Sequence, residues 1–85
     1  MKLNKDILIK YEELKDEIEN QAEKVIKEYF KFKNWKFPSD FSLGDVELGT
    51  KKDVVYINYY GFQDYSSEVV PLEYFLTLDN NLFKN

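Results

Sequence analysis

Residues 54–60 read Val-Val-Tyr-Ile-Asn-Tyr-Tyr, a stretch dense in β-branched and aromatic side chains. Such side chains favour strands, and successive side chains of a strand point to opposite faces of its sheet. The alternation gives one face with Val55, Ile57 and Tyr59 and another with Val54, Tyr56, Asn58 and Tyr60. The stretch therefore predicts a strand with one face suited to a core and a second face rich in tyrosine.

The segments on both sides of this stretch keep the period of two. Residues 41–48 predict a preceding strand with a bulge at Gly44-Asp45, and residues 49–53 predict the hairpin loop that joins the two strands. Residues 61–67 predict a turn, and residues 68–70 predict a short third strand. Together these elements predict a three-stranded antiparallel sheet.

The C-terminal segment predicts a helical turn after the sheet. Pro71 ends the third strand and suits the first position of a helical turn over residues 72–76, because proline has no N–H to donate. Residues 79–81 predict a further turn. Leu82-Phe83 could then fold back and cover the sheet.

The first third of the chain predicts one long helix. Apolar residues recur there at a mean step of 3.67 residues, close to the helical period. They are Ile7, Tyr11, Leu14, Ile18, Ala22, Val25 and Tyr29. Asn4 is the predicted N-cap, and Leu3 with Leu8 has the spacing of a hydrophobic staple. Asn34 favours a left-handed helix end, and Pro38 prevents continuation.

These elements predict the α+β fold class. The expected arrangement is one long N-terminal helix packed on a three-stranded antiparallel sheet, with a short C-terminal helical turn. Residues 1–85 are expected to form a single domain, in which residues 1–36 supply the helix and connector and residues 37–85 the sheet and C-terminal turn. One helix covers one face of a small sheet, so we expect the function on the other face.

The composition excludes several classes of site. The chain of 85 residues has no Cys and no His, which removes zinc fingers and every Ser-His or Cys-His arrangement. All 12 basic residues are Lys, so guanidinium recognition of guanine or phosphate is excluded. The sequence contains neither a calcium-binding loop nor a glycine-rich phosphate loop. We therefore expect a non-enzymatic protein with no cofactor, no metal site and no catalytic residues.

The N-terminal apolar run is short. Ile7-Leu8-Ile9 is too short for the apolar region of a signal peptide and far too short for a membrane span. The sequence therefore predicts a cytoplasmic location and no membrane partner.

The tyrosine-rich strand face and the turn after it form the candidate partner-binding site. Tyrosine is enriched at protein interfaces because it combines a large apolar ring with a polar tip. The predicted binding residues are Tyr56, Asn58, Tyr60, Phe62, Asp64, Tyr65 and Glu68, with Asp64 and Glu68 as an acidic rim. Two alternatives remain open. The C-terminal residues Tyr74, Phe75 and Phe83 could cover this face, or a second copy could pair with it.

Charge is divided unevenly along the chain. Residues 1–36 hold nine Lys and eight acids, whereas residues 37–85 hold three Lys and eight acids and carry a net charge of −5. An acidic sheet would steer the protein toward a basic partner, including one that normally holds nucleic acid. A solvated surface that only maintains solubility is the alternative explanation.

Residues 27–37, KEYFKFKNWKF, interleave lysines with aromatic rings. This pattern is compatible with single-stranded nucleic acid, whose bases stack on rings and whose phosphates pair with lysines. The overall net charge of −4 weighs against direct nucleic-acid binding, and the rings would equally fill the corner between helix and sheet. A homodimeric structural protein is a further alternative, in which the helix stripe pairs with its own copy. The 3.67-residue step does not favour a left-handed coiled coil.

Residues 53–65, DVVYINYYGFQDY, and residues 70–75, VPLEYF, lie within a region, residues 46–76, that resembles small acidic phage or mobile-element proteins of AT-rich bacteria. Such proteins commonly pair a charged helix with an aromatic antiparallel sheet, and they include anti-CRISPR inhibitors and other counter-defence proteins. The resemblance implies an inhibitor that occupies a basic surface of a host defence protein in the host cytoplasm. It assigns no role to an individual residue.

Overall fold

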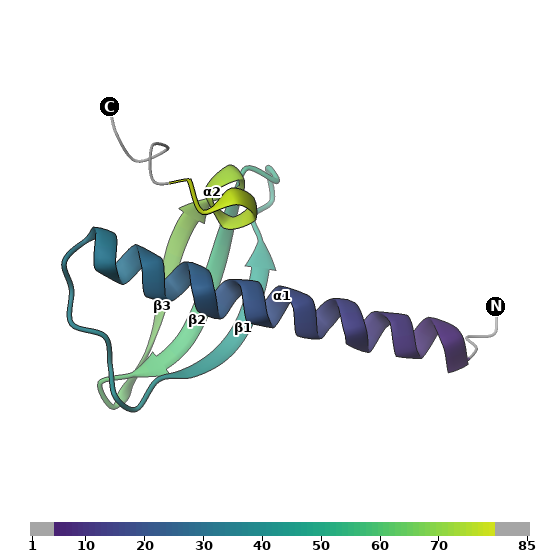
Figure 1. Ribbon diagram of the computed structural model, residues 1–85, viewed down its shortest axis with the longest axis horizontal. Helices are drawn as coiled ribbons and strands as arrows, with labels where there is room; N and C mark the ends of the chain where they lie inside the picture. Colours follow the sequence, from purple (N-terminus) through teal and green to yellow (C-terminus); the bar gives the residue numbers. More distant parts are fainter. Residues whose placement is uncertain (1–4, 80–85) are drawn as a thin grey trace.

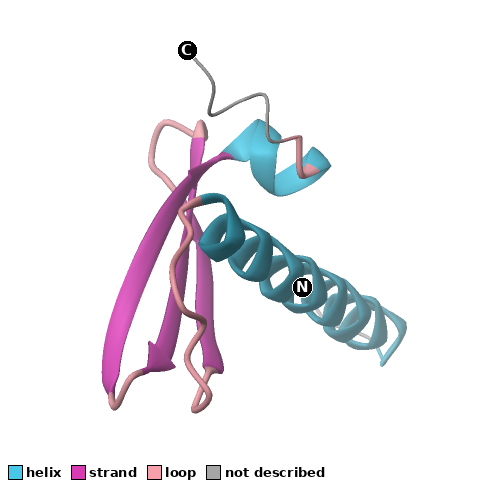
Figure 2. Ribbon diagram, turned by 60° about the vertical axis from the view of Figure 1, so that its left-hand side comes forward, coloured by secondary structure: helices cyan, strands magenta, loops and turns pink. Residues whose placement is uncertain are grey.

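Two helices lie on one side of a three-stranded antiparallel sheet in the computed structural model, which describes residues 5–79 (Figure 1). The elements are α1 (Lys5–Phe32), β1 (Ser42–Leu48), β2 (Val54–Gly61), β3 (Asp64–Pro71) and α2 (Leu72–Thr77). The strand order is β1-β2-β3, so β2 is the central strand. Figure 2, turned by 60°, shows α1 and α2 on the same side of the sheet. The predicted α+β fold is confirmed.

The central strand pairs with both neighbours in the way its residue pattern predicts. Ile57 lies opposite Val46 of β1, and Val55 lies opposite Val70 of β3. The register of β1 shifts between Leu43 and Val46, which confirms the predicted bulge. Alternation along β2 then leaves Val55, Ile57 and Tyr59 buried beneath the helices.

The third strand is longer than the sequence predicts. β3 begins at Asp64, and only Phe62 and Gln63 separate it from β2. Both residues have positive φ, 55° and 63°, as the central residues of a type I′ hairpin turn do. Asn-Gly or a similar pair is the usual sequence signal for this turn, and Phe-Gln does not carry it. The predicted turn over residues 61–67 was therefore too long.

Helix α1 ends in a Schellman motif, as Asn34 predicts. Asn34 has a φ of 58°, and its N–H donates to Lys31 O at 3.0 Å. The Trp35 N–H donates to Phe30 O at 2.9 Å. These two bonds satisfy carbonyls that the end of a helix leaves without partners. The Trp35 and Phe30 rings meet edge to face at 5.4 Å, which adds the apolar contact typical of this motif.

The core lies where the C-terminal half of α1 crosses the sheet. Its buried residues are Ala22, Val25, Ile26, Tyr29 and Phe30 of α1, Val55, Ile57 and Tyr59 of β2, Val70 of β3, and Tyr74 and Phe75 of α2. Gln21 Nε2 donates to Phe75 O at 2.7 Å and so joins α2 to α1. The buried Pro38 packs over Gly61, where a Cβ would lie 2.6 Å from Pro38 Cγ. Position 61 therefore requires glycine.

The N-terminal half of α1 does not pack on the sheet, although the apolar stripe continues through it. Tyr11, Leu14 and Ile18 are 66%, 56% and 47% exposed, and burial begins only at Ala22. A helix of 28 residues is about 42 Å long, whereas the outer strands of a three-stranded sheet are about 10 Å apart. Figure 1 shows the purple half of α1 extending past β1. The predicted packing of the long helix on the sheet is therefore made by the C-terminal half of α1 and not by this half.

Some predictions concern residues outside the described range of 5–79. These are the N-cap Asn4, the staple residue Leu3, the turn residues Asn80-Asn81, and Leu82-Phe83 as a cover for the sheet.

The two halves of α1 predict effects of different size for the same Ile→Ala substitution. We expect Ile26→Ala, which opens a cavity in the core, to lower the free energy of unfolding by about 2–5 kcal/mol. We expect Ile18→Ala, the same change on the exposed half, to alter it by about 0.5 kcal/mol or less. Urea denaturation of dilute protein measures both values. Equal losses in the two variants would contradict the division of α1 into a buried and an exposed half.

Candidate functional site

The outer face of the sheet, opposite the helices, gathers side chains from all three strands. Tyr56 and Tyr60 of β2 alternate with the buried Ile57 and Tyr59 and so point to this face. Val69 lies opposite Tyr56, and Tyr65 lies opposite Tyr60, so both belong to the same face. We define the outer patch as Tyr56, Tyr60, Tyr65 and Val69.

The outer patch is open to solvent. Tyr65, Val69 and Tyr56 are 81%, 46% and 38% exposed, and Tyr60 is half-buried. Tyr74 and Phe75, which the sequence allowed as a cover, instead lie in the core on the helix side of the sheet. Phe83, the third residue of that predicted cover, lies outside the described residues. Within residues 5–79 both helices lie on the other side, so neither covers the outer patch.

Contacts between neighbouring strands hold the patch in place. The Tyr60 and Tyr65 rings meet edge to face, with centroids 5.2 Å apart. These two rings and residues 42–44 line a shallow depression of about 420 Å³. Beside the rings, the Ser67 hydroxyl donates to Asn58 Oδ1. The patch therefore combines apolar rings with one polar position on a paired backbone, where cross-strand contacts limit side-chain motion.

The exposed Phe62 is held at the tip of the β2–β3 turn by a carboxylate from a distant segment. Asp40 Oδ2 accepts from Gln63 N at 2.8 Å, and Asp40 Oδ1 accepts from Phe62 N at 2.7 Å. The N–H groups of Gln63 and Phe62 lower the pKa of Asp40 below its ordinary value of 3.8, because both bonds favour the charged carboxylate. Asp40 thereby stabilises a turn that requires two positive φ angles. The sequence analysis missed this role because the chain between residues 40 and 62 contains no signal for the contact.

The predicted acidic rim does not lie around the outer patch. Glu68 faces the helix side opposite Ile57, where the Tyr59 hydroxyl donates to Glu68 Oε2 at 2.8 Å. Burial of the Tyr59 hydroxyl is the main reason that the pKa of Tyr59 is raised to about 12, and the bond to the Glu68 carboxylate contributes to the same shift. Asp64 lies at the turn and accepts from Tyr65 N at 2.8 Å through Oδ1.

The acid that shares the outer face is Glu47. It is exposed on β1 and lies directly opposite Tyr56. Val69 and Glu47 lie on the outer face, although the sequence analysis did not assign them to the site. A register for the third strand beginning at Asp64 would have placed Val69 there, and the predicted bulge in the first strand could have placed Glu47.

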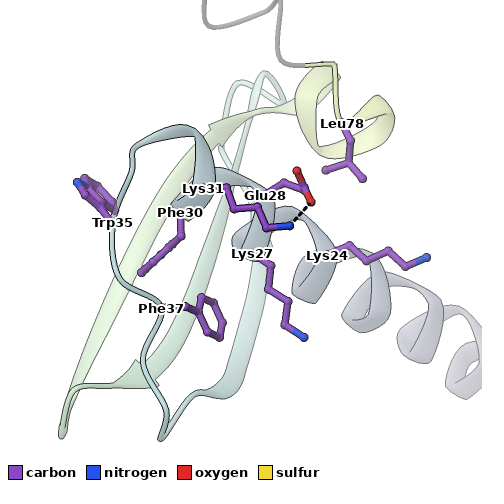
Figure 3. A pocket seen from close by; sticks show the side chains of 8 residues that line it. All are labelled: Lys24, Lys27, Glu28, Phe30, Lys31, Trp35, Phe37 and Leu78. Atoms are coloured by element: carbon purple, nitrogen blue, oxygen red, sulfur yellow. Dashed lines mark hydrogen bonds and ion pairs between the residues drawn. The ribbon is translucent and has the colours of Figure 1, made fainter.

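Some of the lysine and aromatic residues of positions 27–37 line an open pocket of about 540 Å³ (Figure 3). It is lined by Lys24, Lys27, Glu28, Phe30, Lys31, Trp35, Phe37 and Leu78. The buried Phe30 ring packs against Phe37 at 5.4 Å and against Tyr59 at 5.9 Å. The Phe30 and Phe37 rings therefore fill the corner between helix and sheet, which is the alternative to nucleic-acid binding that the sequence allows for this stretch.

Two lysines of this stretch lie beside acids of α1. Lys27 Nζ lies 3.4 Å from Glu23 Oε1, and Lys31 Nζ lies 3.5 Å from Glu28 Oε1. These pairs reduce the positive field that would attract a nucleic-acid backbone. The arrangement weighs against a stacking platform for single-stranded nucleic acid.

The described residues hold neither a cluster of metal ligands nor a helix suited to cross a membrane. Residues 5–79 contain no group of three or more potential ligand side chains placed to hold a metal ion. In the same range, neither helix combines the length and apolar character that crossing a membrane requires.

Comparison with known proteins does not place the chain in a family. No protein-family model matches the sequence, and no curated protein and no solved structure gives a significant match.

The clamp on the β2–β3 turn predicts an effect of pH. We expect Asp40→Ala to lower the urea midpoint at neutral pH, because it removes both bonds to the turn. The pKa of Asp40 is lowered, so its stabilisation is present above pH 3.8 and is lost as the pH falls through and below that value. The difference between the variant and the unmodified chain should therefore shrink in acid.

Asp16→Ala is the matched control for this experiment. It removes the same charge from the exposed half of α1 and should not lower the midpoint. A pH-independent difference between Asp40→Ala and the unmodified chain would contradict the clamp.

Proposed function

We propose that the protein is a non-enzymatic protein-binding module that uses the outer patch as its contact surface. The observation that supports this most directly is that both helices cover one face of the sheet, while the opposite face presents Tyr56, Tyr65 and Val69 to solvent. Tyrosine is among the residues that contribute most to binding at protein interfaces. Its two side-chain torsions also make it inexpensive to order on binding.

The charge of the strands supports a basic partner. β1, β2 and β3 contain the acids Asp45, Glu47, Asp64 and Glu68 and no lysine. Glu47 lies on the outer face beside Tyr56, where it would meet a lysine or arginine of the partner. The same distribution of charge opposes a phosphate backbone, which is a second reason to propose a protein as the partner.

The resemblance of residues 46–76 to small phage or mobile-element proteins supplies a proposed biological setting. In that setting the module is an anti-CRISPR-like inhibitor that occupies a basic surface of a host defence protein, in the cytoplasm of the host cell. A basic surface that normally holds nucleic acid fits the acidic sheet by charge. The partner itself is defined here only by this chemistry.

The outer patch predicts which substitutions abolish binding. We expect the double variant Tyr56→Ala with Tyr65→Ala to weaken partner binding at least about a hundredfold, because each truncation of a central interface tyrosine costs about 2 kcal/mol. The test captures partners from nuclease-treated host lysate on the immobilised chain and then titrates the captured protein. Both residues are exposed, so the thermal midpoint should change little.

Leu76→Ala is the control, because it removes an exposed apolar side chain from α2, on the other side of the sheet. It should leave binding to the captured protein unchanged. Full binding by the double variant, or loss of binding only after nuclease treatment, would contradict a protein-binding outer patch.

A further inference from the structure

The exposed half of α1 carries a row of apolar side chains, three of which line a groove beside the sheet. The row consists of Ile7, Tyr11, Leu14 and Ile18, each between 47% and 66% exposed. Tyr11, Leu14 and Ile18 form one wall of an open groove of about 820 Å³, and Leu43 and Val46 of β1 lie on the other wall. Contiguous exposed apolar side chains are typical of an interaction site, whereas single exposed apolar residues are ordinary on a protein surface.

The spacing of the row is the same in both directions along the helix. Its steps are 4, 3 and 4 residues, so reversing the chain direction places Ile7 where Ile18 was and Tyr11 where Leu14 was. Two copies of this half-helix packed antiparallel about a two-fold axis would therefore match Ile7 with Ile18 and Tyr11 with Leu14 at both ends. Self-complementarity of this kind is what an isologous dimer interface requires.

Charge selects the same orientation. Residues 5–11 carry two lysines and one acid, whereas residues 14–20 carry one lysine and three acids. An antiparallel pair lays the first segment against the second, and Lys10 and Glu17, which flank the row on one side, then meet across the two-fold axis. A parallel pair would instead lay the acidic segment against its own copy. Opposite charges across the seam favour the antiparallel arrangement.

The groove fits a helix better than an added strand. The bulge between Leu43 and Val46 interrupts the regular ladder of β1, and such a bulge protects an edge strand from pairing. Asp45 on the same wall would also repel the identical edge of a second copy. It would instead attract the lysine-bearing segment 5–11 of a second α1 laid antiparallel in the groove.

We infer that α1 is a homodimerisation element. The occupant of the groove is the N-terminal half of α1 from a second copy, paired antiparallel across the row Ile7, Tyr11, Leu14 and Ile18. The dimer leaves both outer patches free, because the seam lies on the helix side and past the β1 edge of the sheet. This inference does not depend on the proposed function.

The mass in solution tests the dimer. We expect light scattering on the full chain to give twice 10.2 kDa and to approach 10.2 kDa only on dilution. Leu14→Glu should raise the dissociation constant at least about a hundredfold, because it places two carboxylates in the apolar seam. Ile9→Glu is the matched control, since Ile9 is exposed on the opposite side of the same half-helix, and it should leave the dimer intact.

Two further variants test the orientation. Lys10→Glu and Glu17→Lys should each weaken the dimer about tenfold, and the combination should restore it, because the two charges exchange places. The chain has no cysteine, so single cysteines give an unambiguous cross-link. A mixture of Ile7→Cys and Ile18→Cys chains should form a covalent heterodimer on oxidation, whereas Ile7→Cys alone should not cross-link.

Several outcomes would overturn the inference. They are a monomer at every concentration, a dimer that Leu14→Glu leaves intact, and cross-linking of Ile7→Cys to itself, which indicates a parallel pair. A dimer lost in Tyr56→Ala with Tyr65→Ala but kept in Leu14→Glu would assign the seam to the outer patch, and would contradict both this inference and the independence of the two surfaces.

Discussion

The structure depends on a mismatch of length between α1 and the sheet it packs on. A helix of 28 residues is about four times as long as the distance between the outer strands of a three-stranded sheet. The sheet can bury only the segment of α1 that crosses it, which begins at Ala22. The apolar row of the first half is therefore left in solvent by geometry, although its side chains are as apolar as those in the core.

A second constraint concerns the two faces of the sheet. The connection from β3 through Pro71 returns the chain to the side that α1 already occupies, and the bond from Gln21 to Phe75 O fixes α2 there. Tyr74 and Phe75, the buried aromatic residues of α2, therefore lie in the core on the helix side of the sheet. The opposite face keeps its tyrosines exposed, and it does so on a backbone whose hairpin is clamped by Asp40. A rigid support of this kind lowers the entropy lost when side chains bind a partner.

The two exposed surfaces differ in chemistry and in position. The outer patch is built from tyrosine and valine on acidic strands, which suits a partner of opposite charge. The row on α1 is built from aliphatic residues and one tyrosine, with charges of both signs arranged along its length, which suits its own copy. Because they lie on opposite sides of the sheet, both can be occupied at once, and a dimer through α1 would present two outer patches to a partner with repeated sites.

The sequence by itself determined the local elements. Four local features follow from residues that are neighbours in the chain, and each is present in the structure. They are the helical period of α1, the left-handed end at Asn34, the bulge at Gly44-Asp45 and the alternation along β2. The tertiary structure alone decided which apolar residues of α1 are buried, because their burial depends on where α1 lies relative to the sheet edge. It also decided that Glu68 faces Tyr59 and that Asp40 holds the turn at Phe62 and Gln63. The position of Glu68 follows from the register of β3, which is set by a turn without the usual glycine or asparagine signal. The Asp40 contact joins segments that are 22 residues apart in the chain. Neither is encoded in a local pattern, since both arise only when distant parts of the chain meet.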